Sequence, residues 1–244
     1  MYLLLSKMKM SLLIYIVVLM SCVSCTFESE GVYTDDTSEE YELYDYYIDE
    51  YGNEGIVAAR LYDSSSYELC RIIVISLDET CLPWGPTGEV IYKRDVYNKN
   101  EFSQPEFGVA MHQEMMSLGV EKFPSQNWCN QKNKGEKYPR AGSWRLPTKK
   151  EYDFIFGDGG AKVEKLNNAL RSVGAITIKT ENFYWTCVED YDGYVSIKDL
   201  ESDYDPENRA IIMTCNNTTQ GYKDRWLKTN RYYVRAIKYI YYKE

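Results

Sequence analysis

The carboxylates between residues 189 and 207 are the side chains best suited to chemistry, because acidic residues at short spacing can hold a calcium ion. When this segment is aligned on its single glycine as the sixth position of an EF-hand-type loop, Asp190 and Asp192 fall at the third and fifth positions and Asp199 at the twelfth. The first position is then Val188, whose side chain cannot bind a metal. We therefore predict a solvated acidic loop without a cofactor, and calcium at the three aspartates is the alternative.

Histidine and cysteine offer no recognisable catalytic arrangement. His112 is the only histidine, so neither a histidine-based metal site nor a serine–histidine pair can be assembled, and we expect it at the border of a helix's apolar face. Apart from Cys22 and Cys25, no two cysteines have the C-x-x-C spacing of a metal site, and the pattern of any disulfides stays open. No spacing selects two carboxylates as a glycosidase pair. We predict a protein that is not an enzyme.

Aromatic side chains supply the second candidate site. The chain contains 24 tyrosines, and tyrosine favours strands, so strand propensity is one explanation of the excess. The other is ligand binding, because sugar rings stack on aromatic faces. The predicted ligand-binding residues are Tyr191, Tyr194, Tyr204, Tyr222 and Trp226, with ordinary packing as the alternative.

Residues 1–21 have the composition of a secretion signal. Lys7 and Lys9 precede an apolar run that is short for a membrane span. The four residues that end at Cys22, Leu-Met-Ser-Cys, resemble the site at which bacterial lipoproteins are cleaved and acylated, and Cys25 is the alternative. An ordinary signal peptide and an uncleaved anchor are the other interpretations. We predict a protein of the cell envelope, lipid-anchored to the outer membrane at its surface or periplasmic face.

An acidic, tyrosine-rich tether is predicted over residues 22–50. No lysine or arginine occurs between Glu28 and Tyr51, a composition typical of a solvated spacer. The tyrosines from Tyr41 onward leave open an edge strand or a partner-binding segment. Without residues 1–21 the chain has 26 basic residues (28 minus 2) and 37 acidic ones, a net charge of −11. This charge argues against nucleic acid as a partner.

One stretch of the remaining chain, residues 51–244, satisfies several local rules at once and is expected to organise the fold. Pro147 keeps the residues before it extended, and Thr148 and Glu151 have the spacing of a capping box that starts a helix. The apolar residues that follow recur at helical spacing, so the helix docks on a core. The structural hallmark residues, with one aromatic further along the chain, are Trp144, Arg145, Leu146, Pro147, Thr148, Glu151 and Trp185.

Apolar periodicity and turn residues place the other elements. We expect a hairpin of residues 55–62 and 67–77, helices over residues 107–118, 125–129 and 163–173, and strands over residues 183–188, 209–215, 224–228 and 231–242. The segment from residue 80 to 105 is rich in proline and glycine and is predicted to be a loop. Runs of strands beside runs of helices predict an α+β domain.

The stretch W-R-L-P-T-x-x-E-Y, which begins at Trp144, resembles the hallmark of C-type-lectin-like domains. These include the formylglycine-generating enzymes and the Lcl C-terminal domain family, also called domain of unknown function 1566. Residues 73–85, 123–130, 184–189 and 232–237 resemble further motifs of that family in the same order. The resemblance implies a C-type-lectin-like fold with mixed or antiparallel strands and two to three helices. The paired catalytic cysteines of the enzymes are missing, because Cys187 and Cys215 lie 28 positions apart.

Together these features predict a lipid-anchored bacterial cell-surface protein with a non-catalytic domain for adhesion, through carbohydrate or protein binding. The alternative is an accessory or structural subunit of a surface assembly, such as a pilus or a polysaccharide-uptake complex. A degenerate enzyme is a further alternative.

Overall fold

The structure, a computed structural model, describes residues 41–49, 51–62, 69–91, 105–134, 142–157, 160–190, 205–215 and 223–242. All of them belong to Thr34–Glu244, the second of two units into which the chain divides. The predicted signal peptide and both candidate lipidation sites, Cys22 and Cys25, lie outside the described residues. Within the described ranges, no helix combines the length and the apolar character that a membrane span requires.

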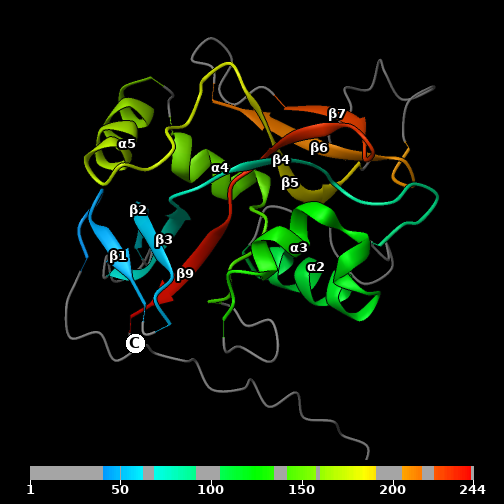
Figure 1. The fold of residues 1–244 in the computed structure, drawn as a ribbon, viewed down its shortest axis with the longest axis horizontal. Coiled ribbons are helices and arrows are strands. Elements are labelled where there is room, and N and C mark those ends of the chain that lie inside the picture. Colours follow the sequence, from blue (N-terminus) through cyan, green and yellow to red (C-terminus); the bar gives the residue numbers. More distant parts are fainter. Residues whose placement is uncertain are drawn as a thin grey trace, which may run out of the picture. The chain divides into compact units, whose positions relative to one another are not determined.

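An antiparallel sheet joins the first and last strands of the domain (Figure 1). Its order is β1 (Tyr46–Ile48), β2 (Glu54–Tyr62), β3 (Leu69–Ser76) and β9 (Ile237–Tyr241). β2 and β3 are the predicted hairpin, and most of β3 is buried, as its unbroken apolar run predicts. β1 and β9 are the edge strands of this sheet.

The second sheet has five strands in the order β4 (Thr80–Pro83), β8 (Arg231–Val234), β5 (Phe183–Glu189), β6 (Arg209–Thr214) and β7 (Lys223–Leu227). Neighbouring strands are antiparallel except β5 and β8, which are parallel. β4 corrects the prediction of a loop from residue 80. Its partner β8 lies about 150 positions later in the chain, so no local pattern reveals it.

The predicted strand over residues 231–242 is wrong in one respect, because the chain changes sheets between β8 and β9. Arg235 lies at this crossover with a buried guanidinium that donates to Glu79 Oε2 at 2.9 Å and to the Ser76 carbonyl at 2.9 Å. The Ala236 N–H donates to the Ser76 hydroxyl at 3.2 Å. These contacts hold the crossover against the end of β3.

Four α-helices and one short 3-10 helix, Val120–Lys122, complete the described fold, one or two α-helices more than the resemblance implies. They are α2 (Pro105–Ser117), α3 (Pro124–Asn130), α4 (Lys149–Phe156) and α5 (Gly160–Ser172). α4 and α5 pack on β2, and α2 packs on β5, so each sheet has its own helical cover (Figure 1). Both apolar clusters draw residues from both sheets, so the two sheets share their core. The mixed α+β class is therefore confirmed.

Two details of the helices differ from expectation. Phe123 is the N-cap of α3 and Pro124 its first residue, so Ser125 is not the cap; its hydroxyl donates to the Pro83 carbonyl at 2.7 Å instead. His112 is fully buried and does not lie at the border of an apolar face. Its Nε2 is 3.2 Å from Asn130 Oδ1 on α3, so this histidine joins the two helices.

The hallmark stretch forms as predicted. Trp144 is fully buried, and Arg145 makes a two-way backbone bridge to Ile237 of β9, at 2.9 and 3.0 Å. Thr148 is the N-cap of α4: its hydroxyl accepts from the Glu151 N–H at 3.2 Å, and the Glu151 carboxylate accepts from the Thr148 N–H at 2.7 Å. The capping box is thus confirmed, and it docks α4 against the four-stranded sheet.

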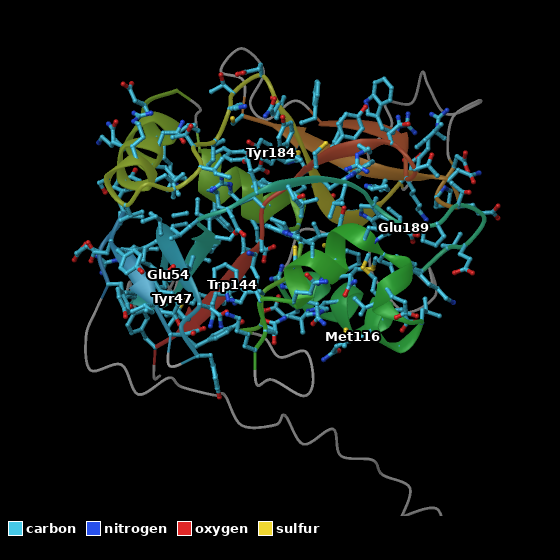
Figure 2. All side chains as sticks on the ribbon, viewed as in Figure 1. Tyr47, Glu54, Met116, Trp144, Tyr184 and Glu189 are labelled. Carbon is cyan, nitrogen blue, oxygen red and sulfur yellow. The ribbon has the colours of Figure 1, made fainter. Side chains whose placement is uncertain are left out.

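The predicted tether extends too far. Residues 41–49 belong to the folded domain, because β1 pairs with β2 and Tyr47 is only 2 % exposed (Figure 2). The Asp49 carboxylate accepts from Lys238 Nζ of β9 at 3.1 Å, and Lys238 lies 5.4 Å from the centroid of the Tyr47 ring. The edge strand, one of the alternatives that the tyrosines left open, is correct for this segment.

Candidate functional site

A cluster of aromatic rings, carried by β5, β7 and β8, forms the first candidate surface. Tyr232 of β8 lies at its centre, with ring centroids 6.0 Å from Phe183, 5.0 Å from Trp185 and 5.9 Å from Trp226. Trp185 is fully buried, and its Nε1 donates to the Leu82 carbonyl at 3.0 Å, so it is the floor of the cluster. Phe183 and Tyr232 are half-buried, and Trp226 is 41 % exposed. We call Phe183, Trp226 and Tyr232 the aromatic surface.

The aromatic surface contains one of the five predicted ligand-binding residues, Trp226. The other four, Tyr191, Tyr194, Tyr204 and Tyr222, lie outside the described residues. Phe183 and Tyr232 are new members that the sequence analysis missed. Phe183 is two positions before Trp185 on the same strand, so the period of a strand places both on one face. Tyr232 carries no comparable signal among so many tyrosines.

Asp190, the third position of the hypothetical calcium loop, is engaged within the protein. Its side chain is fully buried; Oδ2 accepts from the Asp205 N–H at 3.1 Å and lies 3.4 Å from Arg225 Nη1 of β7. Burial raises the pKa of this carboxyl above its ordinary value, against the opposing effect of the Asp205 N–H and Arg225. The described residues hold no group of three metal-ligating side chains. Asp192 and Asp199 lie outside them, so the predicted solvated loop and the calcium alternative both stay open.

A buried ion pair stands beside Asp190, and no local sequence pattern indicates it. Lys228 Nζ, on a side chain that is fully buried, is 2.5 Å from Glu189 Oε1 and donates to the Glu89 carbonyl at 2.9 Å. The ammonium also lies 4.9 Å from the centroid of the Trp84 ring. Both oxygens of Glu189 accept from the Ile91 N–H at 3.1 Å. This pair therefore ties the segment after β4 to the end of β5.

Two buried thiols and the histidine in the described part of the chain are in their unreactive states. Cys70, Cys81, Cys129, Cys187 and Cys215 are all free. Burial raises the pKa of the Cys129 and Cys187 thiols well above the ordinary value, and burial lowers the pKa of the third group, His112, to about 4. At neutral pH these two thiols are protonated and His112 is uncharged, so none of the three is an activated nucleophile or acid.

The outer side of β1 is the second candidate surface. Four large side chains within nine residues are exposed here: Leu43 by 38 %, Tyr46 by 40 %, Ile48 by 52 % and Tyr51 by 48 %. Figure 1 places β1 at the outer margin of its sheet, beside β2. We call these four residues and the backbone of β1 the β1 edge. An exposed apolar edge strand is a surface on which another chain can dock.

Comparison with known proteins gives one informative likeness. A scan against protein-family models finds no match, and a search of curated proteins finds none. Among solved structures, the chain is similar to the crystal structure of a fimbrial protein from Bacteroides ovatus ATCC 8483, with a TM-score of 0.57 and 16 % sequence identity. The similarity covers 83 % of this chain and 49 % of the fimbrial protein, so this chain spans about half of that protein's length. At this identity, the comparison shows a shared fold.

Proposed function

We propose that this chain is a subunit of a bacterial surface assembly of the fimbrial kind, exported and lipid-anchored through Cys22, and that its domain binds other molecules without catalysing a reaction. The observation that carries this proposal is the fold shared with the Bacteroides ovatus fimbrial protein over 83 % of the chain. It favours the assembly role over general adhesion. The sequence resemblance to C-type-lectin-like domains is compatible with it and remains a proposal about the fold family.

The exposed β1 edge supports an assembly role. Lysine, proline and covering segments are among the devices that protect edge strands in monomeric proteins. β1 and its flanks, residues 41–49, contain neither lysine nor proline. A neighbouring subunit can bind such an edge by adding a strand, which supplies both backbone hydrogen bonds and apolar contact.

The test is to express the full chain with a surface tag in a fimbriated Bacteroides strain, shear the cells, and sediment the polymers. The proposal expects the chain in the polymer fraction and cross-linked to polymer subunits. Mass spectrometry of the mature N-terminus should show an acylated Cys22, and a Cys22→Ala variant should lose the acyl group. A chain that stays monomeric in the envelope, without cross-links, would contradict the assembly role.

Glycan binding by the aromatic surface is the second candidate function, favoured by the exposed ring of Trp226 beside Tyr232. A glycan array probed with and without calcium tests it. Trp226→Ala should abolish a signal that Leu227→Ala retains, because Leu227 is equally exposed, at 44 %, but has no ring for a sugar to stack on. A glycan signal that survives Trp226→Ala would show that the glycan binds outside the aromatic surface.

A further inference from the structure

The hydrogen-bond pattern of β1 leaves one side of this strand directed away from its sheet. The backbone groups of Asp45 and Asp49 point toward β2. The Asp45 carbonyl accepts from the Val57 N–H at 3.0 Å, and the Asp49 N–H donates to the Asn53 carbonyl at 3.0 Å. In an antiparallel pair, alternate residues point their backbone groups away from the neighbour. Tyr46 and Ile48, which pair with Ile56 and Glu54 across the ladder, therefore direct their N–H and C=O groups outward.

The side chains of these two residues add an apolar surface to that outward backbone. Tyr46 and Ile48 lie on the face of the sheet that α4 and α5 cover over β2. Both side chains are nevertheless 40 % or more exposed. A strand added beside β1 would place every second side chain against Tyr46 and Ile48, because side chains alternate between the faces of a sheet.

The carboxylates around β1 indicate which side chains an added strand would carry at its other positions. The described carboxylates here are Glu42, Asp45, Asp49 and Glu54, and the cations that pair with them are Arg60 with Glu42 and Lys238 with Asp49. Four negative charges minus two positive charges leave an excess of two, carried by Asp45 and Glu54, both of which are exposed. Among the described residues, Asp45 accepts the Glu42 N–H and Glu54 accepts the Tyr46 hydroxyl, and neither contact supplies a positive charge. Glu54 lies across from Ile48 on the face of Tyr46 and Ile48, whereas Asp45 lies on the opposite face.

We infer that the β1 edge binds an extended segment of another protein in which apolar residues alternate with lysine or arginine. This inference rests on the proposed assembly role and names the kind of neighbour that the subunit would meet. The segment pairs with the outward backbone of Tyr46 and Ile48, and its apolar side chains cover these two residues. Its cations lie on the opposite face of the sheet and reach Asp45. A second copy of the same edge fits less well, because it would bring two acidic strands together.

The experiment uses the full chain and short capped peptides as probes, with binding followed by fluorescence anisotropy. A peptide of alternating isoleucine and lysine should bind. A peptide with glutamate in place of lysine, and an isoleucine–lysine peptide with methylated alternate amides, should bind at least about tenfold more weakly, since each loses one part of the recognition.

The decisive variant is Ile48→Pro. Proline removes an outward N–H that β2 does not use, so the fold should keep its unfolding temperature, while peptide binding falls by about tenfold or more. Ile48→Ala keeps the N–H, so its peptide binding should fall less than that of Ile48→Pro. Ile176→Ala, at a residue 46 % exposed elsewhere, should bind like the parent chain.

Three results would overturn the inference: equal binding by Ile48→Pro, equal binding of the glutamate peptide, or self-association of the chain through β1 in place of peptide binding. Failure here is separable from failure of the assembly role. If Ile48→Pro still enters the sheared surface polymers, the β1 inference falls and the assembly role stands. If the parent chain binds the peptide but never enters the polymers, the assembly role falls.

Discussion

Removing the carboxylate of Glu151 tests most directly how the hallmark stretch holds the domain together. Arg145 Nη2 is 2.6 Å from Glu151 Oε1 and Nη1 is 2.8 Å from Oε2, and both side chains are 1 % exposed. Glu151→Ala would leave a buried guanidinium without its counter-ion, which costs about 3–5 kcal/mol. The same change removes one half of the capping box at Thr148, which adds about 1 kcal/mol. The sum, about 4–6 kcal/mol, is comparable with the lower end of the stability of a typical domain, which is about 5–15 kcal/mol.

Urea unfolding followed by tryptophan fluorescence gives the free energy of unfolding for the comparison. Glu151→Ala should lower the midpoint strongly or abolish folding. The matched control is the double variant Arg145→Met with Glu151→Leu, which removes both charges and should cost only the cap, about 1 kcal/mol. If Glu151→Ala alone costs less than about 1 kcal/mol, the buried pair does not organise the fold and the reasoning is refuted.

Three further changes address other parts of the structure. Gly108→Ala should destabilise the domain by about 1–3 kcal/mol in thermal unfolding, because a Cβ at this position would lie 2.5 Å from Nη1 of the buried Arg145; an unchanged melting temperature would show that α2 can shift. Lys228→Met should cost about 3–5 kcal/mol by leaving Glu189 buried without its cation, and Lys228→Met with Glu189→Leu should recover most of it. His112 has a pKa of about 4 when folded and 6.5 as its ordinary value, so the unfolded chain takes up a proton first as the pH falls. The stabilisation from neutral His112 is therefore fully present above pH 6.5 and is lost toward pH 4, by up to about 1.4 kcal/mol per pH unit. His112→Gln should reduce this dependence of the free energy of unfolding on pH, as measured by urea unfolding at several pH values. An unchanged pH dependence would contradict the lowered pKa of His112.

The assembly role and the hallmark stretch concern different parts of the molecule. Arg145, Thr148 and Glu151 are buried and bind one another, so their contribution is to the stability of the domain. The candidate surfaces are the aromatic surface and the β1 edge, which include the exposed side chains of Trp226, Tyr46 and Ile48. Variants of the first kind should unfold the protein, whereas variants of the second kind should change binding alone.

The sequence by itself determined the elements whose signals are local. The capping box at Thr148, the helices near residues 107–118 and 163–173 and the hairpin of β2 and β3 each depend on residues within one or two turns or strands of each other. Hydroxyl capping, apolar periodicity and turn chemistry act over that range, so the pattern alone predicts them.

Only the tertiary structure decided what depends on residues far apart in the chain. The Lys228–Glu189 pair joins positions 39 apart, and Arg235 reaches Glu79 across 156 positions to split one expected strand into β8 and β9. β1 became an edge strand because Tyr47 has a core to enter and Lys238 to pack against, neither of which is near it in the sequence. The energy of such contacts exists only once the fold brings the partners together, so a local pattern carries no record of them.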